Sequence, residues 1–503
     1  MASTTLQRLI LAISLSTPWA HMAVANADVL SQTPQSLCCK SFRQLLPESG
    51  QVELPGSPGF VEESSQYFSA QESELVPSCR LNPTSPEQVS LILNTATRLG
   101  CEFAVRSGGH MPWAGSANIE GLGVTIDLSS MNSTTLSKDR TIAYVESGAK
   151  WGSVYNTLES TGLVAVGARG QGIGVGGFLL GGGISFFSPK YGFGSDSVVG
   201  YQVVTANGEI IEANSLQNPD LFWALRLGST NFGVVTRFDL RTIPSTQMWG
   251  GIRSFNLSYA FDAAKAMIDF TDRVAAEGLD TVGLDLGAGN TFFMNFAHIT
   301  PDINGSQADV FNSTLSIPFL SDTTRSNVTL LNLLQEIDAL FSSGFHVSFR
   351  TLSIVPDAQF IVDMWEEGRK IFASYDGNPN ASWTLGYSPF ALSMLKATEV
   401  ADDAQGLTTA DGAIMNILLS AFWTDDVSED DMQTKLASLI EWGKTTAQER
   451  GIWNKYIYLN YASPDVDPYT SLKPNNTQRL MGIRDRYDPE GLLRKLWVGG
   501  FKL

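Results

Sequence analysis

The alternation of apolar and polar residues divides the chain up to about residue 245 into short strands and helices. Ser85, Pro86 and Gln88 form the start signal of a helix over 85–100, and Gly100 is a typical stop. The remaining runs have the period of a strand or of a helix. Strands are predicted over 101–106, 123–128, 141–147 and 232–243, helices over 151–161 and 219–228, and a hairpin over 197–214 around the Asn207-Gly208 turn.

From about residue 246 the pattern changes, because glycine becomes rarer and the helical stretches become longer. Strand-like residues over 283–299 alternate with predicted helices over 357–375 and 428–450, followed by a predicted strand over 452–462 and a short helical turn over 479–496. We read this order as two α+β units, the first of which is completed by the C-terminal tail.

Composition excludes some classes of partner. The 503 residues are 43% hydrophobic, enough for two or three domains with real cores. The chain has 33 basic and 51 acidic side chains, a net charge of −18. Binding to nucleic acid or to an anionic membrane needs a basic surface, so we expect neither.

The N-terminus resembles a secretory signal peptide. A single basic residue, Arg8, precedes the apolar run 9–20, which is too short to span a bilayer. Small residues then permit cleavage after Ala25 or Ala27. We predict a signal peptide over 1–27 and a secreted protein.

Cysteines and glycosylation motifs agree with export. An even number of cysteines in a secreted chain predicts two disulfides. Cys38 and Cys39 are adjacent, so each is expected to pair with Cys79 or Cys101, and both connectivities stay open. Zinc is disfavoured, because neither a Cys-x-x-Cys motif nor a histidine cluster is present. Sequons for N-glycosylation occur at Asn132, Asn256, Asn304, Asn312, Asn327, Asn380 and Asn475.

The glycine-rich stretch 170–198 contains Gly172, Gly174 and Gly177 in the G-x-G-x-x-G spacing of dinucleotide-binding folds. That motif requires a helix directly after it, and three consecutive glycines at 181–183 would break such a helix. We therefore reject a Rossmann fold. The glycines instead indicate backbone lying against a large planar or phosphate-bearing ligand, where side chains would collide.

Several segments in a fixed order carry a family resemblance. They are Arg106-Ser107-Gly108-Gly109-His110, the glycines from 174 to 183, Tyr191-Gly192, 220–226, 232–235, Tyr458-Leu459-Asn460-Tyr461 and Tyr487-Asp488-Pro489. Together they resemble the berberine-bridge-enzyme-like FAD-linked oxidoreductases of the PCMH-type FAD (vanillyl-alcohol-oxidase) superfamily. The ending Gly-Gly-Phe-Lys-Leu resembles the fungal secreted branch.

The resemblance implies an α+β fold with a PCMH-type FAD-binding domain of two α/β subdomains, over 28–245. A substrate-binding domain over 246–450 should hold an antiparallel sheet covered by helices. The segment 451–503 should return to the FAD domain.

The resemblance also implies the cofactor site. His110 is the expected covalent link to the 8α-methyl of FAD. Many relatives have a second link through a cysteine, but the matching residue here is Gly170, so we expect a single bond. The other expected cofactor-binding residues are Arg106, Ser107, Gly108, Gly109, Gly172, Gly174, Gly176, Gly177, Gly182, Val235 and Asn460.

Tyr461 is the candidate catalytic base by the same resemblance. An ordinary tyrosine, with a pKa of about 10, is a poor base near neutrality and needs a nearby cation or hydrogen-bond donors. Asn460 would point to the opposite face of a strand, and Tyr458 would either line the site or reach neither group. Ile173 matches a position linked to oxygen access, so reoxidation by O₂ with release of H₂O₂ is expected.

Three functions stay open at this point. The first is an FAD oxidase acting on an alcohol or amine of a small secondary-metabolite-type molecule, and the second oxidises an oligosaccharide lactol. The third is a non-catalytic secreted glycan-binding protein on a flavin scaffold. A closed apolar pocket would favour the first, as Phe292, Phe293, Phe296 and Phe345 suggest. His298 and His346 receive no role, no metal is expected, and the protein is expected to be a monomer or weak oligomer.

Overall fold

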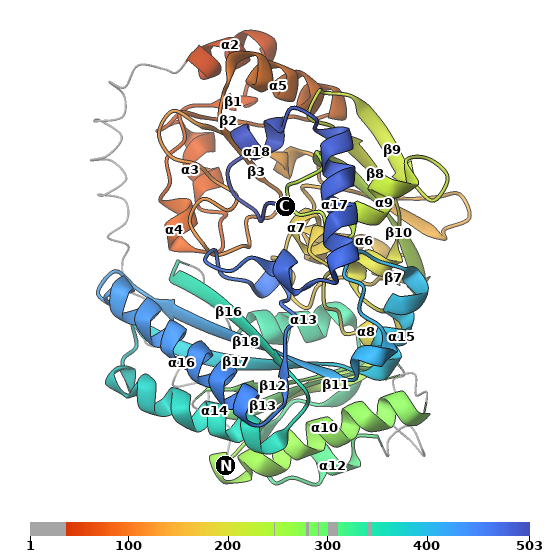
Figure 1. The fold of residues 1–503 in the computed structure, drawn as a ribbon, viewed down its shortest axis with the longest axis vertical. Helices are drawn as coiled ribbons and strands as arrows, with labels where there is room; N and C mark the ends of the chain where they lie inside the picture. Colours follow the sequence, from red (N-terminus) through yellow and green to blue (C-terminus); the bar gives the residue numbers. More distant parts are fainter. Residues whose placement is uncertain (1–36, 246, 278–280, 290, 300–309, 341–343) are drawn as a thin grey trace.

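The computed structural model describes residues 37–503 apart from 246, 278–280, 290, 300–309 and 341–343. Two units are stacked along the longest axis of the molecule (Figure 1). The amino-terminal unit contains two sheets, whose strands end at Pro244, and the second unit contains one larger sheet. The predicted signal peptide and the sequon at Asn304 lie outside the described residues.

The first sheet of the amino-terminal unit has the order β1-β2-β4-β3, in which β4 pairs in parallel with both neighbours. Its strands are β1 (Val52–Glu53), β2 (Cys79–Leu81), β3 (Phe103–Arg106) and β4 (Val124–Asp127). The covering helices are α2 (Leu37–Leu45), α3 (Pro58–Ser64), α4 (Ala70–Ser73) and α5 (Pro86–Leu99). Cys38 bonds to Cys101 and Cys39 bonds to Cys79, so α2 is tied to this sheet.

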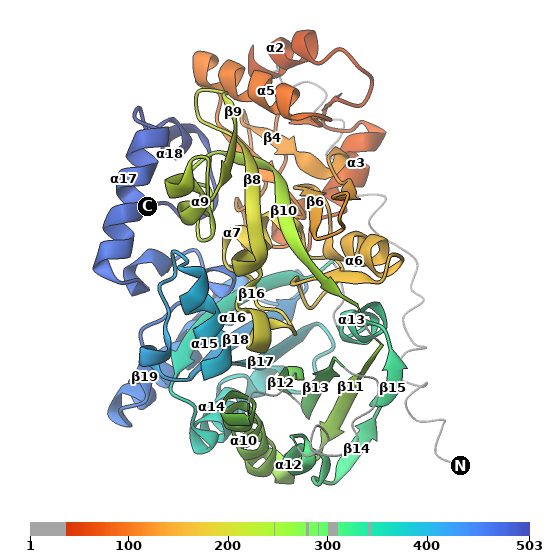
Figure 2. The ribbon, with the colours of Figure 1, turned by 90° about the vertical axis from the view of Figure 1, so that its right-hand side faces the viewer.

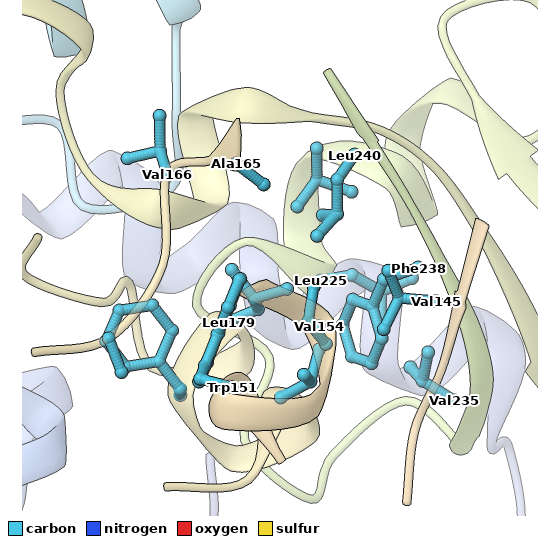
Figure 3. Close-up of a cluster of buried hydrophobic side chains, with 14 of the residues drawn as sticks. Val145, Trp151, Val154, Ala165, Val166, Leu179, Leu225, Val235, Phe238 and Leu240 are labelled. Atoms are coloured by element: carbon cyan, nitrogen blue, oxygen red, sulfur yellow. The ribbon is translucent and has the colours of Figure 1, made fainter. Parts of the chain in front are cut away.

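The second sheet is antiparallel, with the order β5-β6-β10-β8-β9 and with β7 beside β10. Its strands are β5 (Thr134–Leu136), β6 (Ile142–Glu146), β7 (Leu163–Ala165), β8 (Val198–Val204), β9 (Ile210–Asn214) and β10 (Val234–Pro244). The accompanying helices are α6 (Trp151–Glu159), α7 (Val175–Leu180), α8 (Ser188–Tyr191) and α9 (Pro219–Leu225). Figure 3 shows Trp151 and Leu179, from α6 and α7, packed in one buried cluster with Phe238 and Leu240 of β10.

The local predictions for this unit are confirmed. The Ser85 hydroxyl accepts a hydrogen bond from the Gln88 amide at 3.4 Å and caps α5, and Gly100 ends the helix in the left-handed region at φ 67°. The predicted hairpin is formed by β8 and β9. The glycines at 181–183 end α7 after six residues, so the long helix of a Rossmann fold is not formed.

The second unit is an antiparallel sheet with the order β14-β11-β13-β12-β17-β18-β16-β19, and β15 pairs with β11. Its strands are β11 (Met248–Phe255), β12 (Thr281–Ala288), β13 (Phe292–His298), β14 (Phe319–Asp322), β15 (Arg325–Val328), β16 (His346–Ile354), β17 (Ala381–Phe390), β18 (Ile414–Trp423) and β19 (Trp453–Asn454). Its helices are α10 (Ala260–Glu277), α12 (Asn312–Leu315), α13 (Leu330–Asp338), α14 (Ala358–Ile371), α15 (Leu392–Ala401) and α16 (Glu429–Glu449). Figures 1 and 2 show α10, α14 and α16 on the outer face of the sheet, as expected for an antiparallel sheet covered by helices.

The predicted strand over 452–462 is wrong for most of its length. Only Trp453 and Asn454 pair with β16. The Asn454 side chain then accepts a hydrogen bond from the Tyr456 amide at 2.9 Å, which turns the chain away from the sheet edge, and a 3₁₀ turn follows at Leu459–Tyr461. The apolar alternation that suggested a strand reflects Tyr456 and Tyr458, which are both buried in one hydrophobic cluster.

The C-terminal tail packs against the amino-terminal unit (Figure 1). Its helices are α17 (Pro474–Tyr487) and α18 (Leu492–Leu496). After α18, the Trp497 ring lies 5.8 Å from that of Phe103 on β3. In the part of the chain that the structure describes, no helix combines the length and apolar character needed to cross a bilayer.

Candidate active site

A cavity of about 790 Å³ lies between the two units and is also lined by the C-terminal segment. Its floor on the side of the second unit is one face of the sheet, which contributes alternate residues of β17 and β18. These are Thr384, Gly386 and Ser388 from β17 and Leu418, Ser420 and Phe422 from β18, with further lining from Leu385 and Tyr387. The opposite face of the sheet packs against the helices, so strand alternation directs most side chains either to the core or to the cavity, and only Leu385 and Tyr387 of these residues belong to both.

The segment 106–110 and the glycine-rich stretch 170–198 meet on the side of the cavity formed by the amino-terminal unit. A Cβ at Gly108 would overlap with Gly174, so the two backbones touch. The Ser107 hydroxyl donates to the Ser147 carbonyl at 2.6 Å and accepts from the Gly176 amide at 3.1 Å. These contacts join segments that are far apart in sequence and leave the Ser107 hydroxyl engaged by the protein.

Two glycines have a different role, because they face open space. Gly172 and Gly177 line the cavity, and a Cβ built at either position would meet nothing within 4 Å. The cavity wall is therefore bare backbone at these positions. Such a surface suits a flat ligand that contacts the main chain directly.

His110 lines the cavity, and its ring stacks on Phe68 with the centroids 4.0 Å apart. Burial, and secondarily the positive charge of Lys150, lowers the pKa of His110 to about 4. The imidazole is therefore neutral at physiological pH and keeps a nitrogen lone pair. It can act as a nucleophile toward an electrophilic group in the cavity.

Lys150, which sequence reasoning missed, also lines the cavity, directly before α6. Burial and the nearby Arg106 cation lower the pKa of its ammonium group. Among the described residues it has no carboxylate within ion-pair distance, so it offers a positive charge to an anionic ligand. A lone lysine at the start of a predicted helix carries no distinctive sequence signal.

Arg106 does not line the cavity. Its side chain is 2% exposed, pairs with Asp127 at 2.6 Å and stacks over the Tyr67 ring at 4.6 Å. A Cβ at Gly109 would meet the Tyr67 ring and the Arg106 side chain, so this buried layer supports the turn before His110. Arg106 therefore packs beneath the loop that carries His110 and does not itself line the cavity as a cofactor-binding residue.

The C-terminal segment brings Tyr461 and Asn460 to the cavity. The Arg169 guanidinium donates one hydrogen bond to the Tyr461 hydroxyl at 2.9 Å and another to the Ser388 hydroxyl at 3.2 Å. The Asn460 amide donates to the Phe178 carbonyl at 3.0 Å and to the Tyr458 hydroxyl at 3.1 Å. Asn460 therefore fixes the glycine-rich segment to the segment that carries Tyr461.

The structure brings most of the predicted site residues into this cavity. Lining it are Ser107, Gly108, Gly109, His110, Gly172, Gly174, Gly176, Gly177, Val235, Asn460 and Tyr461, together with Ile173 and Tyr458. Gly182 is not part of the lining, and it packs near the Gln405 side chain. His298 is buried beside Phe311, and His346 bonds to Asp425 at 2.7 Å, so neither reaches the cavity.

Four phenylalanines line the cavity, namely Phe68, Phe293, Phe349 and Phe422. Of these, the Phe349 ring lies 6.3 Å from the Tyr461 ring. The expected contribution of Phe292, Phe296 and Phe345 is wrong. Phe292 and Phe296 alternate with Phe293 along β13 and point into the core beneath the helices, and Phe345 is not among the lining residues.

Comparison with known proteins agrees with this geometry. The family described as "FAD binding domain" matches residues 77–214. The FAD-dependent monooxygenase sdcF of Emericella nidulans is 32% identical over 487 residues, which cover 94% of this chain and 99% of that protein. 6-Hydroxy-D-nicotine oxidase from Arthrobacter nicotinovorans has a TM-score of 0.73 at 22% identity, over 93% of this chain and 98% of that one. Berberine bridge enzyme has a TM-score of 0.72 at 17% identity, over 92% and 98%.

The fold and the FAD-binding domain define a flavin-dependent oxidoreductase. The chain belongs to the berberine-bridge-enzyme-like family of PCMH-type FAD-linked oxidoreductases. The alternative of a non-catalytic glycan-binding protein is therefore set aside. The residues also fit FAD on physical grounds, since bare glycine backbone, a half-buried ammonium group and a neutral histidine line one cavity.

Proposed function

We propose that this enzyme oxidises an alcohol or amine carbon of a small, largely apolar molecule, with FAD attached through a single bond to His110. The observation that carries the proposal is the shared cavity, which is lined by a neutral His110, bare glycine backbone, Tyr461 and several phenylalanines. FAD, when bound, supplies the acceptor for a hydride from the substrate, and O₂ reoxidises it with release of H₂O₂.

Attachment at His110 is supported by the state of its ring. The imidazole is neutral, so a ring nitrogen is available to form a bond, and stacking on Phe68 fixes the plane of the ring. Attachment through one bond only is supported by the cysteines, all four of which are in disulfides. At Gly170 a Cβ would point toward the Asp338 carboxylate at 3.2 Å, so this position leaves little room for a larger residue.

Tyr461 is proposed to accept the proton that leaves the substrate hydroxyl or amine. Its phenol oxygen has the Arg169 cation at hydrogen-bond distance, which supplies the nearby positive charge that a tyrosine base requires. The lining phenylalanines, with the Phe349 ring 6.3 Å from that of Tyr461, give an apolar substrate a wall to pack against beside the tyrosine.

The lining favours an apolar or aromatic alcohol or amine over an oligosaccharide. Asp338 is the one carboxylate among the described lining residues, and it already accepts from the Gln171 backbone and side chain, both at 3.1 Å. The hydroxyls of Thr384 and Ser420 bond to each other at 2.8 Å. A sugar would leave many hydroxyls without partners against the phenylalanine walls, which carries a desolvation cost.

Secretion and N-glycosylation are part of the same proposal. Two disulfides are typical of an oxidising compartment. Among the sequons that the structure describes, the asparagine is exposed at Asn132, Asn256, Asn312, Asn327 and Asn475, and half-buried at Asn380. Glycosidase treatment of the secreted protein, followed by mass measurement, tests which of them carry glycan.

Acid denaturation of the purified enzyme tests the cofactor link. Yellow colour should stay with the wild-type polypeptide and should be released from His110→Ala, which has lost the attaching nitrogen. Colour that remains bound in His110→Ala contradicts the assignment of the link.

Turnover tests the reaction. Aromatic alcohols, amines and oligosaccharides are supplied one at a time to the wild-type enzyme under anaerobic conditions, and a compound that is a substrate bleaches the flavin. We expect bleaching by an apolar alcohol or amine, and Tyr461→Phe should slow this reduction. With a substrate in hand, labelled O₂ separates two chemistries. Label confined to H₂O₂ supports an oxidase, whereas label in the organic product would make this enzyme a monooxygenase, as the name of the sdcF relative suggests.

A further inference from the structure

The Arg169 guanidinium lies where three separate parts of the chain meet. Arg169 precedes the glycine-rich segment of the amino-terminal unit, Ser388 is on β17 of the second unit, and Tyr461 is in the C-terminal segment. All three side chains line the cavity. The hydrogen bonds that the guanidinium donates to Tyr461 at 2.9 Å and to Ser388 at 3.2 Å therefore tie the proposed base to both units.

We propose that Arg169 is a positioning residue that holds Tyr461 as a phenolate, the basic form needed for catalysis. This inference rests on the proposed function, in which Tyr461 takes a proton from the substrate. A positive charge within hydrogen-bond distance favours the anionic form of a phenol over the neutral form, and so does a donor aimed at its oxygen. Arginine keeps its charge throughout the pH range of enzymes, so the effect does not depend on a second titration.

The proposed step balances for an alcohol substrate. The hydroxyl proton moves to the Tyr461 oxygen, and the carbon loses its hydrogen together with two electrons to oxidised FAD. The remaining electron pair of the O–H bond forms the C=O bond of the product. Arg169 gains and loses nothing, and it stabilises the charge on the Tyr461 oxygen before the proton arrives.

The aromatic neighbours of Tyr461 cannot take over the role of base. The Tyr458 ring lies 4.8 Å from that of Tyr461 and the Phe349 ring lies 6.3 Å away. Burial raises the pKa of Tyr458, and negative charge on Tyr461 raises it further. Tyr458 therefore stays a neutral phenol, which accepts from the Ile184 amide at 3.0 Å.

Other titratable groups line the same cavity and must be separated from Tyr461 in any pH experiment. Burial raises the pKa values of Tyr67 and Tyr387, so both stay protonated. His110 is neutral above a pKa of about 4 before the flavin is attached. Burial lowers the pKa of Lys150 and raises that of Asp338, so both groups can contribute to the pH dependence of activity.

A difference titration isolates the Tyr461 phenol without any substrate. The near-ultraviolet absorbance of tyrosinate is followed against pH in the flavin-loaded enzyme, and the curve of Tyr461→Phe is subtracted, which removes every other tyrosine, the flavin and Lys150. The same subtraction is made in pairs that carry Arg169→Gln, Arg169→Lys or Ser388→Ala, each with and without Tyr461→Phe.

The wild-type midpoint is expected about 1 to 3 pH units below that of Arg169→Gln, because the opposite charge is lost. Arg169→Lys keeps the charge and should recover part of the difference. Ser388→Ala removes a neutral partner of the guanidinium and should shift the midpoint less than Arg169→Gln does. A role confined to packing would leave the midpoint where it is in all three variants.

Equal midpoints in wild type and Arg169→Gln overturn the proposal. Should Arg169→Gln fail to fold, the wild-type curve still decides, since a midpoint at or above about 10, the value of an ordinary tyrosine, also overturns it. A different result would contradict the proposed function without bearing on the role of Arg169. If Tyr461→Phe reduces its flavin with substrate as fast as wild type, Tyr461 is not the base, whatever the midpoints show.

Discussion

Glu72 on α4 gives the sharpest prediction about pH and stability. Its side chain is fully buried, and one carboxyl oxygen accepts from the Ser116 amide at 2.6 Å, the Ser116 hydroxyl at 2.5 Å and the Ala117 amide at 3.0 Å. Both of these residues line the cavity. The second carboxyl oxygen is buried without a partner. Burial outweighs the three hydrogen bonds and raises the pKa of Glu72 from 4.5 to about 7.

The sign and size of the effect follow from this value. The folded protein binds a proton at Glu72 more tightly than the unfolded chain, so the contribution to stability is complete below pH 4.5 and is lost as the pH rises through about 7. One pKa unit corresponds to 1.36 kcal/mol, and the difference of roughly two and a half units corresponds to about 3 kcal/mol. The wild-type enzyme should therefore lose up to this amount of stability between mildly acidic and mildly alkaline solution.

Glu72→Gln removes the ionisation and keeps an oxygen for the three donors. Its free energy of unfolding should exceed that of wild type by up to about 3 kcal/mol near pH 8 and by much less near pH 5. Denaturant unfolding of the flavin-loaded enzyme at both pH values measures the difference. Glu62→Gln, at an exposed position on α3, is the matched control and should show no such dependence on pH.

The result that would refute this reasoning is a Glu72→Gln effect that is the same at both pH values. It would mean that Glu72 is ionised in the folded protein across the whole range, held by its donors and by the nearby Arg80 cation, which acts to lower its pKa. Burial would then not be the dominant influence on this carboxyl group.

Two further predictions concern packing and crosslinking. Gly108→Ala should destabilise the fold by about 1–3 kcal/mol, because its Cβ would overlap with Gly174, whereas Gly177→Ala should leave unfolding unchanged and weaken flavin loading. Thermal unfolding measures the stability of both variants, and the flavin-to-protein absorbance ratio measures flavin loading. Equal losses of stability in the two variants would contradict the assignment of Gly108 to a backbone contact and of Gly177 to the open cavity wall. Replacing Cys38 and Cys101 together by serine leaves the Cys39–Cys79 bond in place, so the loop that opens is shorter than the sequence separation of 63 residues and the expected cost is about 3 kcal/mol. Denaturant unfolding measures it, and an unchanged midpoint would be the contrary result.

Local signals determined much of the fold. The capping residues of α5, the Asn207-Gly208 turn between β8 and β9, and the strand that leads to His110 all lie where the sequence predicts them. Each depends on residues that are close together in the chain, such as a hydroxyl that caps its own helix. The glycine motifs likewise predicted a bare backbone wall, and Gly172 and Gly177 provide it.

Period-two alternation specified the strands of the second unit but not which way they face. Phe292 and Phe293 are equally apolar, yet only Phe293 lines the cavity, because the sheet presents one face to the helices and the other to the amino-terminal unit. The same limit explains the error over 452–462, where the hydrogen bond that the Asn454 side chain accepts from the Tyr456 amide outweighs an apolar pattern typical of a strand.

The tertiary structure alone decided which distant groups act together. The cysteine pairing was open in the sequence and is set by the position of α2 against the first sheet. Arg169 and Tyr461 are 292 residues apart, and nothing in the spacing of either residue predicts their hydrogen bond. Such contacts depend on how the two units pack and on the low dielectric of the cavity between them, and neither can be read from local sequence. The sequence by itself determined the secondary-structure elements and the family. The packing of the units determined which charged side chains act on the proposed base.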